Sequence, residues 1–257
     1  IEENYLPALK GGVSTIEELQ AIINQVNLDV AEKLVAKLEA NPWVADTAEA
    51  YAFVNKISVE ESKAAQKALL DRLDAVIAVN KVLNAAKENM ATVLTDQSFE
   101  NVKEGLDAKY FAAILGDDGF EEGTRVTVAD IQAVIDQVNA EHVSYLIGEV
   151  VAAAEAELLD TNALNAALTN LKTFVGATVW SDDAASISSD VENLKQYGEA
   201  IKEQQPTTVE EIIAILVEAN TVDKINKETD AVALAKIIWD LKVAEFINLA
   251  DDSARED

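Results

Sequence analysis

The stretch STIEELQAIINQVN, residues Ser14–Asn27, returns as VTVADIQAVIDQVN, residues Val126–Asn139. From Thr15 and Thr127 onward, seven of the thirteen aligned positions are identical and five more are conservative exchanges. Each copy begins with a threonine followed three residues later by an acid, which is the pattern of a capped helix start. Apolar residues then recur every three or four positions, as on one face of an α-helix. We therefore expect both copies to open a long amphipathic helix.

Later parts of the chain also occur twice, in the same order. DTAEAYAFVNKI at Asp46 resembles DTNALNAALTNL at Asp160, and DAVIAVNKVLNAA from Asp74 resembles EEIIAILVEANTV from Glu210. Ordered matches of this kind indicate a duplicated structural unit. We predict two tandem antiparallel helical-bundle units with these parts: 1–12 as the tail of a preceding repeat, unit 1 over 13–118, an acidic linker over 119–124, and unit 2 over 125–257 with an insertion near 175–208.

Composition and spacing predict an all-α protein. Only 9 Gly and 3 Pro interrupt 257 residues, of which 49% are apolar, so helix breakers are few and a sizeable core can form. A helix expected over 59–90 carries an apolar stripe with Asn80 in its seam; the stripe is Leu69, Leu73, Val76, Leu83 and Met90. Further helices are expected over 98–115, 127–158, 162–175, 184–204, 208–219 and 229–249.

The formal net charge of −27 restricts the classes of partner. A field of this sign repels the phosphates of nucleic acids and anionic lipid, so we expect no nucleic-acid partner. No apolar run approaches the roughly 20 residues that span a bilayer, so no membrane insertion is expected. The chain has no cysteine, which excludes disulfides and thiolate chemistry and is typical of surface proteins of Gram-positive bacteria.

Two acidic clusters stand at equivalent ends of the two predicted units. Carboxylate oxygens are the ligands that Ca²⁺ prefers, although the spacing does not match an EF-hand loop. A bound ion would stiffen the junctions of a tandem array, and solvated acidic linkers are the plain alternative. The candidate calcium ligands are Asp117, Asp118, Glu121, Glu122, Asp251 and Asp252. No other cofactor is expected.

Four polar residues recur beside the apolar stripe of the duplicated helix. They are Gln20 and Asn27, with their counterparts Gln132 and Asn139. Side-chain amides at such positions can form hydrogen bonds between helices or between units. Shared ancestry alone would preserve them equally well. We treat these four as candidate interaction residues.

The sequence carries no catalytic motif. It has no G-x-S-x-G and no H-E-x-x-H, and the aromatic content of 5% is low for a glycosidase-type cleft. His142 is the single histidine, and we expect a structural or surface role for it. Trp43, Trp180 and Trp239 are expected to be core or inter-helix anchors rather than platforms for a ligand. The chain is therefore not expected to be an enzyme.

The stretches TIEELQAIINQVN, TVADIQAVIDQVN and DAVALAKIIWDLKVAEFINL stand in a Cys-free, acidic chain. In this the sequence resembles the helical repeat regions of surface-layer (S-layer) and other large cell-wall-associated proteins of Bacillus-like Gram-positive bacteria. The resemblance lies in helix patterning and composition rather than in a diagnostic catalytic motif, and it covers most of the chain. It implies a secreted, extracellular protein of the cell surface that binds the wall through other modules and packs into lattices, often with Ca²⁺. The chain begins without Met or a signal peptide, which we interpret as a mature or excised segment.

The leading hypothesis is therefore a non-enzymatic structural module. Its tandem helical bundles would act as a spacer and as a lattice or interaction element, through self-association or contact with neighbouring surface-protein domains. The alternative is an adhesin-like helical module that binds a host protein, a cell-surface protein or a cell-wall polymer. A wall-active enzyme is the third and last hypothesis.

Overall fold

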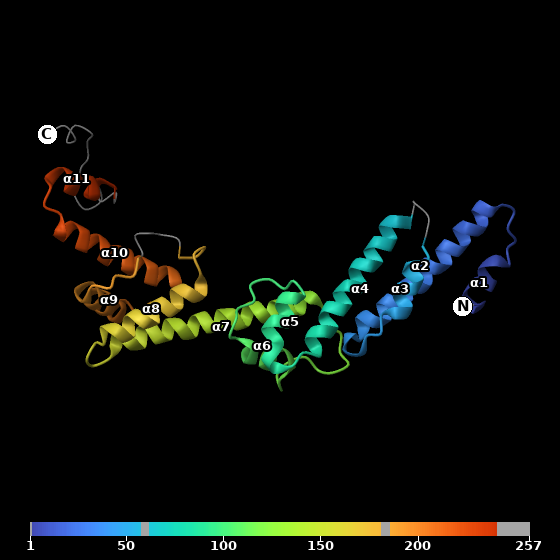
Figure 1. The fold of residues 1–257 in the computed structure, drawn as a ribbon, viewed down its shortest axis with the longest axis horizontal. Helices are drawn as coiled ribbons and strands as arrows, with labels where there is room; N and C mark the ends of the chain where they lie inside the picture. Colours follow the sequence, from blue (N-terminus) through green and yellow to red (C-terminus); the bar gives the residue numbers. More distant parts are fainter. Residues whose placement is uncertain (1, 58–61, 181–185, 241–257) are drawn as a thin grey trace. The chain divides into compact units, whose positions relative to one another are not determined.

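The structure is a computed structural model that describes residues 2–57, 62–180 and 186–240, with side chains between 4 and 237. Eleven α-helices make up most of these residues, among which there is no strand (Figure 1). The all-α prediction is confirmed, whereas the arrangement as two tandem antiparallel bundles is not. The helices are α1 Glu2–Leu9, α2 Ile16–Ala40, α3 Ala48–Val54, α4 Lys63–Leu83, α5 Met90–Asp96, α6 Asp107–Leu115, α7 Val128–Glu155, α8 Thr161–Val175, α9 Val191–Gln204, α10 Val209–Lys227 and α11 Ala231–Asp240.

Several helices are shorter than their apolar spacing predicted. The helix expected over 59–90 is α4, which ends at Leu83, and the helix expected over 184–204 is α9, which begins at Val191. The helix expected over 98–115 begins only at Asp107 as α6. Before it, Ser98 and Asn101 both have positive φ angles, a left-handed conformation that cannot continue a right-handed helix. The predicted helix over 229–249 lies partly outside the described residues.

The start of α7 confirms the predicted capping pattern, and α10 begins with the same pattern. Thr127 Oγ1 accepts a hydrogen bond from the Asp130 amide at 3.2 Å, and the Asp130 carboxylate accepts one from the Thr127 amide at 2.8 Å. Thr208 and Glu211 form the same reciprocal box at α10. Each box satisfies two backbone amides that have no partner inside the helix, which fixes where the helix begins.

The start of α2 differs in one bond. Thr15 Oγ1 accepts from the Glu18 amide at 3.1 Å, but the Glu18 carboxylate reaches the amide of Ser14 at 2.8 Å rather than that of Thr15. At α4 the N-cap is Ser62, whose side chain makes no capping hydrogen bond. The four long helices therefore share a small polar residue at the N-cap and differ in how tightly it holds the first turn.

Buried side chains at the N-terminal side form a first cluster, which we call core 1. It joins the second half of α2, α3 and the first half of α4. Its partly buried members include Leu28 and Leu70. The buried members are Ala31, Val35, Ala50, Phe53, Val54, Ile57, Leu69 and Leu73.

We call core 2 the buried side chains that lie in sequence between core 1 and core 3. They come from the second half of α4, the segment from α5 through α6, and the first half of α7, which hydrogen bonds join to α6 and to the loop before it. Asn80, in the predicted seam of α4, donates from Nδ2 to the carbonyls of Pro42 and Trp43 at 2.7 and 3.0 Å. The amide in the apolar stripe is thus satisfied by backbone. Core 2 contains Val76, Val79, Val82, Leu83, Met90, Ala91, Leu94, Phe99, Leu106, Tyr110, Ile114, Val126, Ile131, Ile135 and Val138.

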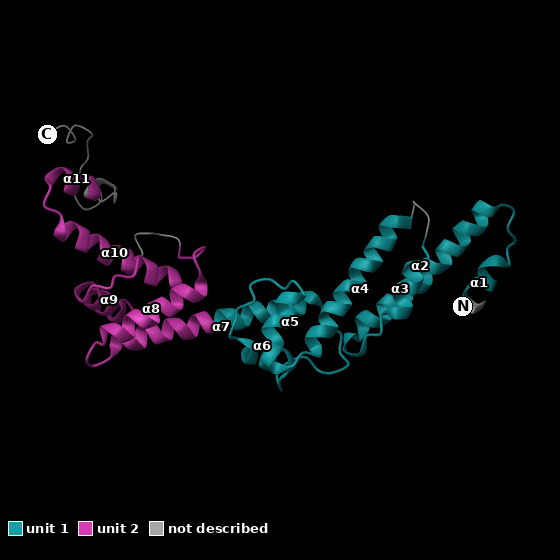
Figure 2. Ribbon diagram, in the orientation of Figure 1, with its two compact units in different colours: residues 1–140 teal, residues 141–257 magenta. Residues whose placement is uncertain are grey.

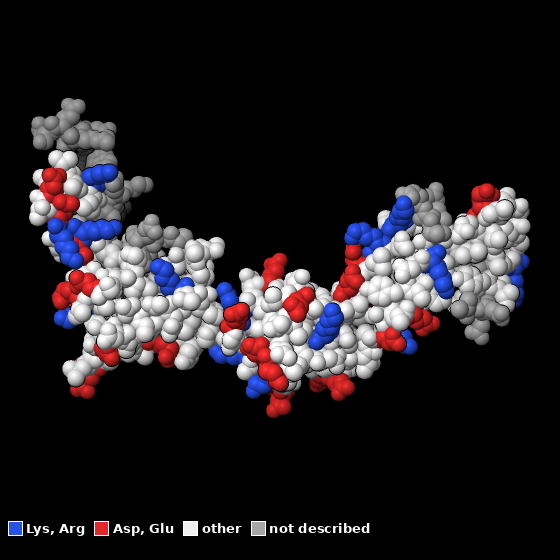
Figure 3. Space-filling view, in the orientation of Figure 1, with Lys and Arg blue, Asp and Glu red and all other residues white. Residues whose placement is uncertain are grey.

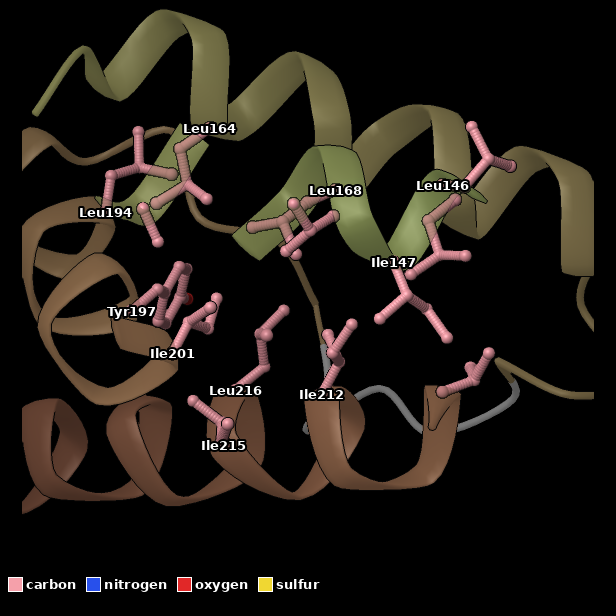
Figure 4. Packing of buried hydrophobic residues seen from close by; sticks show 14 of the residues in the cluster. Leu146, Ile147, Leu164, Leu168, Leu194, Tyr197, Ile201, Ile212, Ile215 and Leu216 are labelled. Atoms are coloured by element: carbon pink, nitrogen blue, oxygen red, sulfur yellow. The ribbon is translucent and has the colours of Figure 1, made fainter. Parts of the chain in front are cut away.

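Core 3 joins the second half of α7 with α8, α9 and the first half of α10. Figure 4 shows side chains from these helices pointing toward one another, with Tyr197 among the leucines and isoleucines. Its buried members are Leu146, Ile147, Val150, Ala154, Leu164, Leu168, Leu171, Trp180, Leu194, Tyr197, Ile201, Val209, Ile212, Ile215 and Leu216.

The long helices α4 and α7 each contribute to two successive cores. In α4, Leu73 belongs to core 1 and Val76 to core 2. In α7, Val138 belongs to core 2 and Leu146 to core 3. A helix that serves two cores carries apolar residues on more than one side, which weakens the single stripe of an ordinary amphipathic helix.

By its internal contacts, the chain divides into a unit of residues 1–140 and a unit of residues 141–257 (Figure 2). The division falls inside α7, between Ala140 and Glu141, and not in the predicted linker 119–124. The first unit holds cores 1 and 2, and the second holds core 3. The repeat boundaries predicted from the sequence concern a duplication rather than packing, and they stay a prediction.

Candidate functional site

Four of the five tyrosines occupy the same kind of position. Each lies on a short helix, and its hydroxyl donates a hydrogen bond to a side-chain oxygen of the next long helix. We call these contacts joints 1 to 4 in chain order. They are Tyr5 with Asn27 at 2.5 Å, Tyr51 with Asp74 at 2.6 Å, Tyr110 with Asn139 at 2.7 Å, and Tyr197 with Asn220.

The acceptor of every joint has the same place in its helix. It lies twelve residues after the N-cap residue, which is Thr15, Ser62, Thr127 and Thr208 in turn. In α4 and α7 this place is also where the helix passes from one core to the next. Each joint therefore connects the tyrosine helix of a core to the point on the following long helix at which that core ends.

Joint 3 contains two hydrogen bonds besides that of the tyrosine. Asn139 Nδ2 donates to the Asn101 carbonyl at 2.8 Å, and the Lys103 amide donates to the Tyr110 hydroxyl at 3.0 Å. The Tyr110 side chain is fully buried. The loop before α6 thus supplies a carbonyl and, two residues later, an amide, so the buried Tyr110 hydroxyl and the half-buried Asn139 amide both have partners.

Joint 4 repeats this arrangement in the second unit. Asn220 Nδ2 donates to the Ser186 carbonyl at 2.9 Å, and the Ser188 amide donates to the Tyr197 hydroxyl at 3.4 Å. The carbonyl and the amide are again two residues apart in the loop that precedes the tyrosine helix. Two loops of different sequence have reached the same hydrogen-bond pattern around the same pair of side chains.

Joints 1 and 2 have fewer bonds in the part of the chain that the structure describes. Asn27 is 1% exposed, and its Nδ2 donates to the Lys56 carbonyl at 3.5 Å, at the limit of a hydrogen bond. In joint 2 the acceptor is the exposed carboxylate of Asp74, which has no amide with which to donate. The Tyr51 hydroxyl makes its one described hydrogen bond with it.

Three of the joint tyrosines, Tyr51, Tyr110 and Tyr197, are held in the protonated form, in which the hydroxyl can donate. Burial raises the pKa of Tyr110 and of Tyr197, while the backbone amides that donate to their oxygens lower it in part. Burial, with the hydrogen bond to Asp74 and the charge of that carboxylate, raises the pKa of Tyr51 to about 12. All of these hydroxyls are therefore donors at neutral pH.

The candidate interaction residues lie at or beside the joints. Asn27 and Asn139 are the acceptors of joints 1 and 3 and make hydrogen bonds between helices. Gln132 pairs with both backbone groups of Glu100, accepting from its amide at 2.9 Å and donating to its carbonyl at 3.1 Å. Gln20 donates to Asn24 within α2 at 3.3 Å. An external partner for these residues stays a prediction.

The sequence reasoning missed the tyrosines and two of the acceptors, Asp74 and Asn220. A signal was available in the placement of an Asn or Asp twelve residues after a helix N-cap. The tyrosine could have been found 22, 23, 29 and 23 residues before that acceptor. The variable spacing hid the pairing.

The candidate calcium ligands are only partly described. Asp117, Asp118, Glu121 and Glu122 are exposed in the turn that follows α6, and Asp251 and Asp252 lie outside the described residues. Among the described side chains, no three acids or histidines converge on a point where they could hold a metal ion. Calcium binding stays a prediction.

His142, Trp43 and Trp180 contact other parts of the fold. The His142 ring stacks on Tyr145, with centroids 5.8 Å apart, and meets the edge of Phe174 at 4.6 Å. Trp180 is buried in core 3, and Trp43 Nε1 donates to the Thr124 carbonyl at 3.2 Å. These two are core and anchoring residues, as predicted, and the side chain of Trp239 lies outside the described residues.

A charge network links α2 to α4 in the first unit. Arg72 makes a two-pronged contact with Glu39, with both distances 2.7 Å, and a third bond to Glu32 at 2.7 Å. The hydrogen bonds from Arg72 lower the pKa of Glu39. A groove of about 320 Å³ lies beside it, and its arginine is already paired with these glutamates. The network therefore belongs to the helix interface rather than to a ligand site.

Acidic side chains are spread over the visible faces of both units, as Figure 3 shows, with fewer lysines and arginines between them. They do not gather into one patch on this face. Within the ranges that the structure describes, no helix combines the length and the apolar character needed to cross a membrane.

Comparison with protein-family models, with curated proteins and with solved structures found no match for this chain.

Proposed function

We propose that the chain is a non-enzymatic structural module: a series of helical cores that serves as a spacer and self-association element in a secreted, S-layer-like bacterial surface protein. The recurrence of the joint carries this proposal. The polar side chains that recur along the chain connect its own helices to one another. Their placement supports a structural role rather than a catalytic one.

Sharing of the long helices supports the spacer role. Because α4 and α7 each serve two cores, a chain of this type grows by adding one core and one long helix at a time. Repeat proteins built in this way bury their apolar surface between neighbours, so stability accumulates along the chain rather than in one globule. A spacer of adjustable length is a natural use of such a chain.

The net charge of −27 supports a surface location rich in cations. Divalent ions screen such a charge and can bridge carboxylates of neighbouring molecules. We propose self-association promoted by Ca²⁺ as the mode of assembly, with Asp117, Asp118, Glu121 and Glu122 among its ligands. The acidic residues near the C-terminal end, Asp251 and Asp252, would act in the same way.

The test compares assembly with capture on the same purified chain. Sedimentation velocity, with Ca²⁺ and with Mg²⁺ at equal ionic strength, measures self-association. A pull-down against serum and extracellular-matrix proteins measures capture, and incubation with peptidoglycan measures turnover. We expect concentration-dependent self-association that Ca²⁺ strengthens, without capture and without turnover.

Each of the other outcomes contradicts the proposal, and two of them point to a different function. Saturable binding of one host protein by a monomeric chain would make it an adhesin module. Release of soluble peptidoglycan fragments would make it a wall-active enzyme. A chain that stays monomeric in both ions and captures nothing would contradict the assembly role.

A further inference from the structure

The four joints differ in the number of hydrogen bonds that close them. In joints 3 and 4 the tyrosine, the asparagine and the preceding loop make three bonds together. Among the described residues, joint 2 has one bond, to a carboxylate that water can also reach. A buried bond in a satisfied network resists opening better than an exposed one, because breaking it leaves unpaired groups in the core.

Core 1 is closed by joint 2, the weakest of the series. Its tyrosine helix, α3, has seven residues, and in its first turn the Asp46 carboxylate accepts from the Ala48 amide at 3.1 Å. The long helix that receives the tyrosine, α4, begins at Ser62 without a side-chain cap. Core 2 is closed by joint 3, where α7 begins with the Thr127–Asp130 box and Gln132 adds two further bonds to the loop.

We propose that each joint acts as a strap, a set of hydrogen bonds that holds a tyrosine helix to its long helix, and that these straps differ in strength. Core 1 then opens by itself while cores 2 and 3 remain closed. The unit of opening is α3 with the first half of α4. Asp74 marks the place in α4 where core 1 ends and core 2 begins. The second half of α4 therefore stays packed in core 2 when the first half opens. The strap between a tyrosine helix and its long helix thus sets which segment of the chain yields first.

This inference concerns the fold and holds whichever surface the chain serves. In a spacer under tension or in contact with proteases, α3 and the first half of α4 would be the segment that opens first. The segment can release length and close again while the neighbouring cores keep their structure. Local opening of a weakly held unit below the global transition is common in proteins.

Hydrogen exchange of the full chain, resolved by mass spectrometry under native conditions, tests the order of opening. We expect amides of α3 and of the first half of α4 to exchange at least about tenfold faster than those of α6 and of the first half of α7. The second half of α4 should exchange like α6. Equal protection of α3 and α6, or slower exchange in α3, would overturn the proposal.

Two single-atom variants assign the effect to the joints. Asn139→Asp keeps the acceptor for Tyr110 but removes the amide that donates to Asn101, which turns joint 3 into the kind found at joint 2. We expect exchange in α6 and in the first half of α7 to rise about tenfold, with α3 unchanged. Asp74→Asn is the reciprocal control and should change exchange in core 1 less than about threefold, because no described carbonyl awaits its amide.

A third variant covers the case in which Asn139→Asp unfolds core 2. Gln132→Ala removes the two bonds to Glu100 at the exposed edge of the same strap, and it should accelerate exchange in α6 and α7 without loss of helix. Unchanged exchange in both core 2 variants would show that the bonds do not set the order of opening, which would sink the idea of a strap. The measurement on the unaltered chain remains decisive in every case.

Discussion

At the scale of the residue, tyrosine suits a joint because it combines a large apolar ring with one polar atom at its tip. The ring fills the core, as those of Tyr110 and Tyr197 do, and the hydroxyl needs a partner once it is buried. An asparagine can meet that need and still donate to a backbone carbonyl from its amide group. Asp74 lacks that donor, so it can complete only half of the arrangement.

Tyr51 should ionise late, and its contribution to stability should depend on alkaline pH. Its pKa of about 12 in the folded chain lies above the value of about 10 for an unfolded chain. Folding therefore favours the protonated hydroxyl, and this contribution is complete below pH ~10 and lost as the pH rises toward ~12. Ultraviolet titration of tyrosinate should show a late-ionising tyrosine in the unaltered chain.

The variant Asp74→Asn removes the carboxylate that helps to raise this pKa. Tyr110 and Tyr197 also have raised pKa values. We therefore expect one of several late-ionising tyrosines to ionise at lower pH in Asp74→Asn than in the unaltered chain. Asp71→Asn, which removes the same charge from the same helix where it pairs with Lys67, should leave the titration unchanged. Identical titrations of Asp74→Asn and the unaltered chain would contradict the assignment to joint 2.

Asn220 should contribute more to stability than an ordinary helix residue. Its replacement by Ala leaves the Tyr197 hydroxyl and the Ser186 carbonyl without their partners, which costs about 3 kcal/mol of unfolding free energy. Asn226→Ala, a substitution at an exposed position of the same helix, should cost less than about 0.5 kcal/mol. Urea unfolding followed by circular dichroism measures both, and similar losses in the two variants would argue against joint 4.

At the scale of the element, the sequence predicts helix starts better than helix partners. The threonine–acid pairs at Thr127 and Thr208 are local, so their spacing in the sequence is their spacing in the helix. A joint links residues 22 to 29 positions apart, across a turn or loop whose length varies. No fixed spacing exists that could have indicated the pair.

The alignment of the repeats also shows that spacing in the sequence does not identify equivalent positions in the fold. The sequence match sets Asp74 against Glu210, whereas the joints make Asp74 equivalent to Asn220. The two alignments differ by ten residues, about three helical turns. A shift of ten residues falls about 80° short of three full turns. This is less than the width of a broad apolar stripe, so apolar spacing alone separates the two alignments poorly.

Equivalent helix halves should be interchangeable if the joints mark the true register. Removing residues 28–74 joins Asn27 to Ala75, which fuses the first half of α2 to the second half of α4 without a change of helical phase. We expect a helical chain that lacks core 1 and unfolds cooperatively through cores 2 and 3. Circular dichroism during heating provides the measurement.

A matched deletion supplies the control. Removing residues 28–76 takes out two further positions and turns the fused halves by about 200° relative to each other. This chain should lose helix beyond the loss expected from its length and should melt broadly. If both deletions melt alike, the twelve-residue rule has no structural meaning.

At the scale of the whole molecule, the buried side chains form a series of cores, whereas the two predicted copies concern a duplication of the sequence and stay a prediction. The first unit already contains two cores, and the division at Ala140 falls beside the acceptor of joint 3. The sequence repeat at Thr15 and Thr127 therefore marks the first and third members of a set of four long helices. The two-unit prediction rests on this pair of helices, whose sequences match best.

The net charge of −27 should make stability depend on salt. Repulsion among the carboxylates weakens as the screening length shortens from about 30 Å at 0.01 M salt to about 3 Å at 1 M. We expect the melting temperature to rise by at least about 3 °C over this range. Thermal unfolding in NaCl measures the effect, and a melting temperature that does not rise would contradict it.

A comparison of CaCl₂ with MgCl₂ at equal ionic strength separates screening from a specific site. If the carboxylates at Asp117 and Asp118 bind Ca²⁺, the calcium series should lie above the magnesium series. Replacing both residues with Asn should then remove the difference. Superimposed series would speak against the calcium site and leave screening as the whole effect.

The position of the joint acceptor at the changeover of a long helix also bears on how such genes can change. Recombination that exchanges two copies at this codon yields a helix whose first half completes one core and whose second half begins another. Every core of the product is whole, whereas exchange within a connecting loop would leave half-built cores at both sides. We therefore expect exchange at this codon to change the length of such a chain in steps of one core.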